Sequence, residues 1–174
     1  MALALALLFD DEATAAVERI WSELAAAGIS RDMLDLGYPP HLTLTVVEDE
    51  ARRPQLETAM GRVATLVPEQ LGLAAATVFP GTTVTYLAVD GDLQPVHKAA
   101  TARIGRDDVR VHYRSEDWTP HVTLQTTGDA AAGLQMAKES WRVRQAVRPV
   151  RLELVSFPPV VRLAGCDLAA QAQH

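Results

Sequence analysis

The chain contains the heptapeptide Tyr38-Pro39-Pro40-His41-Leu42-Thr43-Leu44 and repeats its pattern as Trp118-Thr119-Pro120-His121-Val122-Thr123-Leu124. The two histidines lie 80 positions apart (121 − 41). Each copy is followed by a helical stretch and then by a strand that ends in Phe-Pro, at Phe79-Pro80 and at Phe157-Pro158. A second strand then follows in both copies. This matching order indicates two related halves.

Apolar patterning outside the two copies predicts further helices and strands. We expect strands over residues 3–9, 41–47, 71–79, 82–89 and 121–126, and two more at the end of the chain. We expect helices that begin after Asp10 or Asp11, at Asp92 and after Asp129, because aspartate is a good N-cap. We expect a further helix near residue 53, with Pro54 in its first turn. Residues 105–120 are polar and irregular. The pattern predicts two closely packed α+β lobes within one domain over residues 1–174.

Composition limits the class of protein. The chain has 174 residues, of which 48% are hydrophobic and 22% are charged, which suits a folded domain with a sizeable core. Its single cysteine, Cys166, excludes a disulfide framework and a cysteine-rich zinc site. The apolar first residues lack a preceding basic segment and run into Asp10-Asp11-Glu12, unlike a signal peptide. We therefore expect a soluble, cytoplasmic protein.

The charge is unevenly distributed along the chain. The net charge is −6, but residues 1–90 carry 5 basic and 13 acidic side chains, whereas residues 91–174 carry 11 basic and 9 acidic ones. A protein with this balance is not a general binder of polyanions. We expect a phosphate-bearing ligand to take its cationic contacts mainly from the second half.

The His-x-Thr units carry the chemistry. Successive side chains of a strand point to opposite faces, so His41 and Thr43 share one face, as do His121 and Thr123. An imidazole can give or take a proton near neutral pH, and a hydroxyl can donate to an anionic oxygen. One such unit alone is most simply a structural histidine. Two units in matching contexts, each directly after proline, favour a catalytic pair.

A pair of imidazoles supplies what in-line phosphoester chemistry needs. One neutral imidazole can deprotonate a nucleophile while an imidazolium protonates the leaving oxygen on the opposite side of phosphorus. The threonine hydroxyls can hold the non-bridging oxygens. Lobes related by a pseudo-twofold axis would place the two units across one cleft.

His41-Leu42-Thr43-Leu44 and His121-Val122-Thr123-Leu124 resemble the tandem His-x-Thr-x motifs of the 2H phosphoesterase superfamily, which includes 2′-5′ RNA ligase-like proteins and cyclic nucleotide phosphodiesterases. The resemblance implies a bilobal, duplicated α+β fold with two antiparallel-rich sheets flanking a central groove and helices outside. It also implies chemistry without a metal or other cofactor on a 2′,3′-cyclic phosphate or a 2′-5′ linkage. His41, Thr43, His121 and Thr123 are then the catalytic residues.

Two departures from the family shift this expectation towards hydrolysis. RNA ligase-like members often have a basic residue soon after the second motif, where this chain has Gln125-Thr126, and the acidic first half is a poor surface for a long RNA. We therefore expect a phosphodiesterase acting on a small nucleotide or an RNA end. The alternatives are 2′-5′ RNA ligation and a binding module that grips a phosphate or an RNA end without turnover.

Four residues outside the motifs are candidates for substrate binding. Arg114 and Trp118 precede the second motif in a polar loop, where they can reach a phosphate and stack on a base, or else serve as a surface arginine and a packed tryptophan. Phe157 and Tyr86 are candidates to border the cleft. A metal site is not expected, since no His-x-His, His-x3-His or His-Glu-x2-His spacing occurs.

Overall fold

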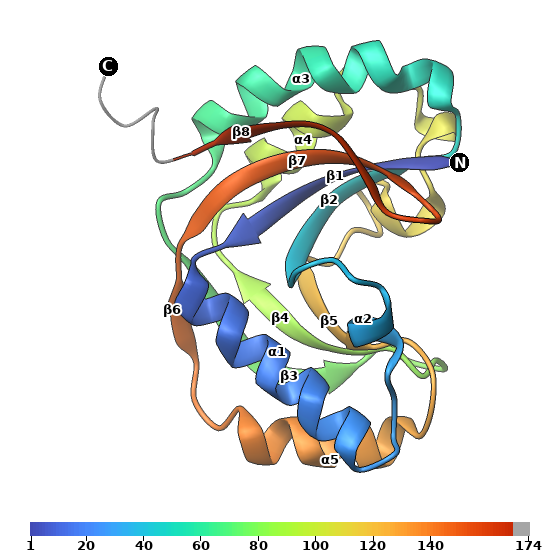
Figure 1. Ribbon diagram of the computed structural model, residues 1–174. Coiled ribbons are helices and arrows are strands. Elements are labelled where there is room, and N and C mark those ends of the chain that lie inside the picture. The colour runs from blue at the N-terminus through green and yellow to red at the C-terminus, as the bar shows by residue number, and fades with distance from the viewer. Residues whose placement is uncertain (169–174) are drawn as a thin grey trace.

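A computed structural model describes residues 1–168, whose strands form one sheet of eight in the order β6-β3-β4-β5-β2-β1-β7-β8 (Figure 1). All pairings between neighbouring strands are antiparallel. The strands are β1 (Ala2–Phe9), β2 (His41–Val47), β3 (Leu71–Val78), β4 (Thr85–Asp90), β5 (His121–Gln125), β6 (Gln145–Val147), β7 (Pro149–Phe157) and β8 (Val161–Asp167). The helices are α1 (Asp11–Ala26), α2 (Asp32–Asp35), α3 (Arg53–Leu66), α4 (Gln94–Thr101) and α5 (Ala130–Ser140). The 3-10 turns are η1 (Glu50–Arg52), η2 (Arg106–Asp108) and η3 (Val111–Tyr113).

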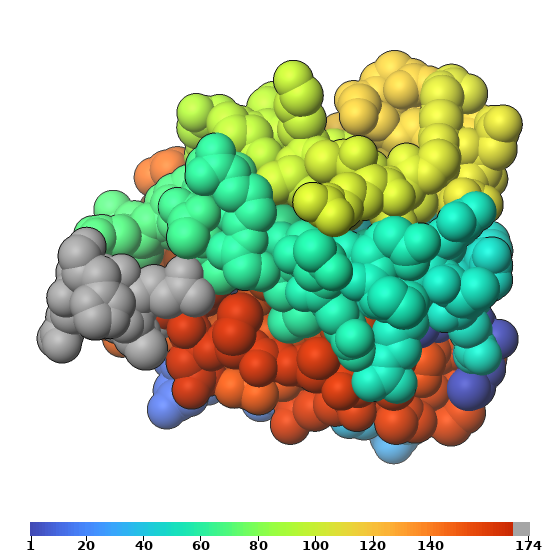
Figure 2. Space-filling view, turned by 90° about the horizontal axis from the view of Figure 1, so that it is seen from above, coloured from blue at the N-terminus to red at the C-terminus, as the bar shows by residue number. Residues whose placement is uncertain are grey.

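The two halves of the sheet meet at a narrow seam. Strands β2 and β5 pair through a single residue pair, Leu42 with Val122. Figure 1 shows the sheet bending between the halves, with α3 and α4 outside one half and α1 and α5 outside the other. Figure 2 shows α3 from outside, lying between α4 and β8. The prediction of two separate sheets is therefore wrong, because the seam joins them into one. The duplication itself stays a prediction.

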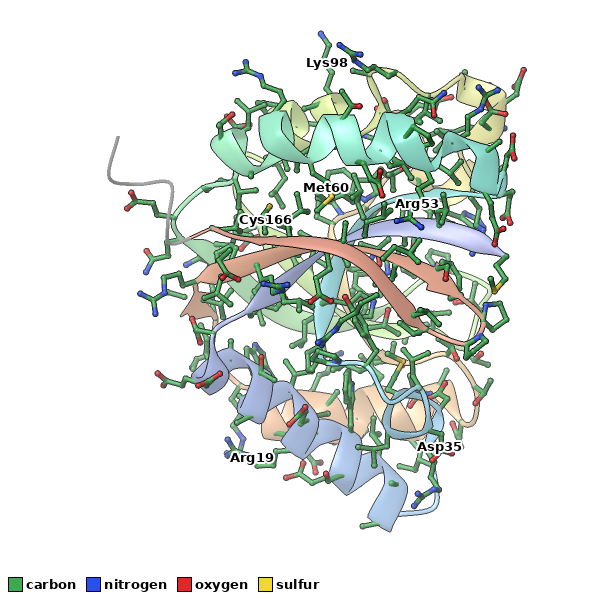
Figure 3. All side chains as sticks on the ribbon, turned by 45° about the horizontal axis from the view of Figure 1, so that its top comes forward. Arg19, Asp35, Arg53, Met60, Lys98 and Cys166 are labelled. Atoms are coloured by element: carbon green, nitrogen blue, oxygen red, sulfur yellow. The ribbon has the colours of Figure 1, made fainter. Side chains whose placement is uncertain are left out.

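Strand β1 shows how the sheet separates a core face from an open face. Its sequence alternates leucine and alanine from Ala2 to Leu7. Leu3, Leu5 and Leu7 pack in the main core with the helices, whereas Ala2, Ala4 and Ala6 belong to a second cluster on the other face. Figure 3 shows Met60 of α3 pointing from its helix towards the sheet, while Arg19 of α1 points away from it. The small alanine side chains leave the open face hollow.

Most local predictions agree with the structure. The side chain of Asp10 accepts a hydrogen bond from Ala13 N at 2.9 Å, and that of Asp129 caps α5 in the same way. Helix α4 differs, because it begins at Gln94 and Asp92 does not cap it. The sequence patterns did not predict α2 or β6, since elements of 4 and 3 residues are too short to show periodicity. Over residues 1–168, no helix has the length and apolarity to cross a membrane.

Candidate active site

The two His-x-Thr units lie side by side at the seam of the sheet. Because Leu42 pairs with Val122 in antiparallel register, His41 is level with Thr123 and His121 is level with Thr43. The apolar residues of both motifs, Leu42 and Val122 among them, are fully buried in the main core. The histidines and threonines therefore share the open face, and each imidazole has the threonine of the other motif as its cross-strand neighbour.

A backbone carbonyl group two residues before each histidine fixes the same tautomer in both imidazole rings. The Nδ1 atom of His41 lies 2.8 Å from Pro39 O, and that of His121 lies 2.7 Å from Thr119 O. A carbonyl oxygen only accepts hydrogen bonds, so Nδ1 carries the proton in both rings. In a neutral imidazole, Nε2 is then the free proton acceptor. Both histidines thus present the same nitrogen for proton transfer.

Two tryptophans hydrogen bond to strand carbonyl groups at the seam. The indole Nε1 of Trp118 donates to Thr43 O at 3.1 Å, and the indole Nε1 of Trp21, on α1, donates to Thr123 O at 3.1 Å. Both indoles are buried, with exposed fractions of 6% and 3%. These bonds satisfy carbonyl groups that a continuous ladder between β2 and β5 would otherwise use. Strands β2 and β5 are joined by one residue pair only, and we call this the splayed seam. The two indole hydrogen bonds end on the carbonyl groups of both motif threonines.

A β-bulge follows each motif at the corresponding position. The register of β2 against β1 shifts between Leu5 and Ala6, and the register of β5 against β4 shifts between Thr85 and Tyr86. The bulge turns Gln125 into the protein, where its Nε2 donates to Asp129 O at 3.3 Å and its exposed fraction is 0%. Bulges of this kind redirect side chains next to functional sites. Gln125 is therefore a structural residue and does not face a ligand.

A groove of about 250 Å³ opens over β1 and β2 beside the motifs. We call it the groove throughout, and the residues that line it are Ala4, Ala6, Asp32, Met33, Leu36, Tyr38, His41, Thr43, Val46, Arg110, Tyr113, Thr123, Thr126, Val155, Phe157 and Val160. It thus contains one imidazole and both motif hydroxyls. His121 is not part of this lining and lies beside two aromatic rings, with centroids 5.0 Å from Phe79 and 5.3 Å from Tyr86.

The environment of the imidazoles disfavours their charged forms. Burial lowers the pKa of His41, and the charge of His121 lowers it further, while the Pro39 carbonyl and the carboxylate of Glu153 act in the opposite direction. Burial also lowers the pKa of His121, against the effect of the Thr119 carbonyl. The two sites are coupled, so the free protein resists holding a proton on both rings at once.

The predicted substrate-binding residues divide into two groups. Phe157 lines the groove, and Tyr86 stacks on Phe79 with centroids 4.1 Å apart, next to His121. Arg114 lies elsewhere, because its Nε donates to Val109 O at 3.2 Å and its side chain lines a separate depression. Trp118 is in the core, stacked on His97 at 4.2 Å. The structure thus does not bring Arg114 or Trp118 to the groove.

The sequence analysis missed three polar residues of the groove. Burial raises the pKa of Tyr113, while the side chain of Thr43 and the charge of Arg110 act in the opposite direction. Arg110 is held by Glu48 at 2.6 Å and lies over the Phe157 ring, 5.4 Å from its centroid. Asp32 accepts hydrogen bonds from the loop after β5. A usable signal was present, since the 80-residue offset aligns Tyr113 with Met33, and both line the groove.

No arrangement for a metal ion is evident in residues 1–168: they contain no group of three or more His, Cys, Asp or Glu side chains that could hold one.

The chain matches the model of a known protein family. The model of the "2′-5′ RNA ligase superfamily" matches residues 9–162. No curated protein sequence matches the chain.

Two solved structures of Escherichia coli LigT show the same fold at low sequence identity. Escherichia coli LigT in apo form has a TM-score of 0.53 and 14% identity, covering 96% of this chain and 98% of that chain. The complex of E. coli LigT with 3′-AMP has a TM-score of 0.51 and 16% identity, with 95% of each chain covered. Kluyveromyces marxianus Usb1 has a TM-score of 0.46 and 16% identity, covering 93% of this chain and 97% of that chain.

Proposed function

Since the chain belongs to the 2′-5′ RNA ligase superfamily, a family of 2H phosphoesterases, we propose that it is a metal-independent phosphodiesterase that hydrolyses a 2′,3′-cyclic phosphate or a related diester of a nucleotide or RNA end. The observation that carries this proposal is the reciprocal arrangement of the motifs. Two imidazoles with the same nitrogen free stand in neighbouring strands, each level with the threonine of the other motif. Acid, base and anion contacts are thus available within one site.

The proposed reaction needs two proton transfers and no cofactor. One neutral imidazole takes a proton from water through Nε2 as the water oxygen attacks phosphorus. The other imidazole, as imidazolium, gives its Nε2 proton to the ribose oxygen whose bond to phosphorus breaks. The products are a phosphate monoester and a free hydroxyl group. Thr43 and Thr123 donate hydrogen bonds to the non-bridging oxygens, on which negative charge grows.

The groove supports a nucleotide as the substrate class. Phe157 and Tyr113 offer aromatic surface over a floor of alanine side chains, and Arg110 offers a guanidinium group at the same opening. Aromatic rings bind bases by stacking, and arginine binds phosphate. This combination, in about 250 Å³, suits a mononucleotide or the end of an RNA better than a long strand. Arg110 thereby replaces Arg114 as the proposed cationic contact from the second half.

The test is turnover of 2′,3′-cyclic nucleotides followed by ³¹P NMR. We expect wild-type protein to release a phosphate monoester, and His41→Ala and His121→Ala each to lose about 10²- to 10⁴-fold in kcat. The double variant should lose less than the product of these factors, because both groups act in one transfer. His112→Ala is the control, since His112 is exposed and outside the groove.

The possible outcomes separate the alternatives. Saturable binding without product would favour a binding module, and joining of RNA halves would favour a ligase. Near-full activity of a folded His41→Ala or His121→Ala variant would refute the two-histidine mechanism. His97→Ala is unsuitable as a second control, because His97 is 1% exposed and hydrogen bonds through Nε2 to Tyr113 O at 2.9 Å.

A further inference from the structure

Glu153 of β7 is a buried carboxylate close to the groove. Its exposed fraction is 1%, and its oxygens accept hydrogen bonds from the Tyr38 hydroxyl at 2.8 Å and from Arg151 Nε at 2.8 Å. Arg162 Nε completes the set at 3.0 Å. Burying a carboxylate costs free energy that its partners only partly offset. The buried position of this carboxylate therefore suggests a functional reason for its presence.

The sheet register connects Glu153 to the first motif. On the open face Glu153 pairs with Ala6 of β1, and Ala6 pairs with Thr43 of β2. Only the methyl group of Ala6 stands between them in this row. Tyr38 also connects Glu153 with the first motif. Its hydroxyl donates to Glu153, and its ring contacts the His41 ring edge-on, with centroids 4.9 Å apart. A continuous set of contacts thus runs from the carboxylate to the imidazole.

The other half of the sheet has no such arrangement. In the row through the second motif, Thr123 pairs with Tyr86, and Tyr86 pairs with Thr77. A large aromatic residue therefore replaces Ala6, and a threonine replaces Glu153. The carboxylate of Glu153 therefore has no counterpart at the matching position of the row through the second motif. The two imidazoles differ in their surroundings although their own backbones match.

We propose that Glu153 and Tyr38 form a positioning pair for His41: the carboxylate fixes the Tyr38 hydroxyl, the Tyr38 ring fixes the plane of the imidazole, and the buried negative charge stabilises a proton on His41 but not on His121. The catalytic meaning of this pair rests on the proposed phosphodiesterase function, whereas its effect on His41 does not. Two directions of pKa agree with it. Glu153 acts to raise the pKa of His41, and burial together with Glu153 raises the pKa of Tyr38, so its hydroxyl stays a neutral donor.

Other charged or titratable groups act on His41, line the same groove or contact Glu153. They are His121 on β5, Asp32 on α2, Arg110 and Tyr113 at η3, and Arg151 and Arg162 behind Glu153. The hydrogen bonds of Asp32 to Ser30 and to Thr126 and Thr127 act against its burial and leave its pKa lowered, so it stays charged throughout the titration range of histidine. Asp32 therefore does not titrate together with His41, whereas His121 does, so the pKa values of both imidazoles must be followed.

The experiment is an NMR titration of the imidazole ring signals, assigned with His41→Ala and His121→Ala, in wild type, Glu153→Gln, Tyr38→Phe and the control Arg144→Gln. Arg144 forms an exposed ion pair with Asp90, outside the groove. We expect Glu153→Gln to lower the pKa of His41, whereas the pKa of His121 should change less, since it responds only through its coupling to His41. Tyr38→Phe should shift the His41 ring signals and not those of His121. On a 2′,3′-cyclic nucleotide, both variants should lose about 10-fold in kcat with little change in KM. The imidazole is then misplaced for proton transfer, whereas substrate binding is unaffected.

The outcomes distinguish this inference from the proposed function. If wild type does not hydrolyse the nucleotide, the proposed function fails, and the titration still decides whether Glu153 controls His41. If His41 titrates alike in wild type and Glu153→Gln, or if His121 shifts equally, the positioning pair is refuted. Tyr38→Phe keeps the test decisive should Glu153→Gln fail to fold, because it removes one hydroxyl and retains the ring; unchanged His41 signals in that variant would also refute the pair.

Discussion

The tryptophan hydrogen bonds at the seam allow a prediction that separates stability from activity. Each of the three tryptophans donates its indole Nε1 to a strand carbonyl: Trp118 to Thr43 O, Trp21 to Thr123 O and Trp141 to Leu73 O. All three indoles are at most 6% exposed. Two of these acceptors belong to the catalytic motifs as proposed, and the third lies on β3, away from them. Trp141→Phe is therefore a matched control for Trp118→Phe and Trp21→Phe.

Each Trp→Phe substitution removes the indole hydrogen bond and part of the buried side-chain volume, and both losses reduce stability. Leaving a buried carbonyl without a donor costs about 1–3 kcal/mol. With the apolar atoms that phenylalanine lacks, each variant should lose about 2–4 kcal/mol in free energy of unfolding. For a chain of this size, that corresponds to a fall in Tm of roughly 4–15 °C. Thermal unfolding followed by circular dichroism measures it, and all three variants should fall in this range.

The expected loss of activity is confined to two of the variants. Trp118→Phe and Trp21→Phe release the carbonyl of the residue whose hydroxyl is proposed to hold the phosphate oxygens, so kcat should fall about 10-fold at a temperature where the variant stays folded. Trp141→Phe should keep the wild-type kcat. Equal kcat in all three variants would show that the splayed seam does not position the threonines. A loss of less than about 0.5 kcal/mol would show that the indole bonds contribute little.

Four further outcomes follow from the same structure. Thr43→Val and Thr123→Val should each reduce kcat by roughly 10- to 1000-fold through lost anion contacts, measured with the cyclic nucleotide, and unchanged kcat would remove the threonines from the mechanism. Burial lowers the pKa of His41, His97 and His121 below 6.5, so the unfolded chain binds protons more readily than the folded one. The free energy of unfolding should therefore fall as the pH drops below 6.5, and denaturant titrations at several pH values can test this. Activity should survive an excess of EDTA; loss that zinc or magnesium restores would overturn the metal-independent proposal. Salt titration of RNA-end binding should give a shallow slope, near −0.7 in log K per phosphate contacted, and a slope for six or more contacts would indicate a long RNA instead.

Local sequence rules predicted much of the fold and the centre of the candidate site. Alternation with a period of two placed His41 and Thr43 together on one face of their strand, because strand geometry requires it. Proline before each histidine and aspartate at two helix starts likewise act within a few residues of themselves. The 80-residue repeat then singled out the two motifs as partners.

Only the tertiary structure decided how the motifs meet and what surrounds them. The single pair Leu42–Val122, which makes one sheet of two halves, joins residues 80 positions apart, and no local pattern specifies such a register. No local pattern specifies the contact of Trp118 either: its indole donates to Thr43 O and therefore does not reach a ligand. Nor does one specify the hydrogen bond between Tyr38 and Glu153, which are 115 positions apart. Periodicity reports which face a side chain takes, since that depends on its own strand. Which groups it meets there depends on packing between distant segments, where burial and hydrogen bonding select among partners that the sequence leaves open.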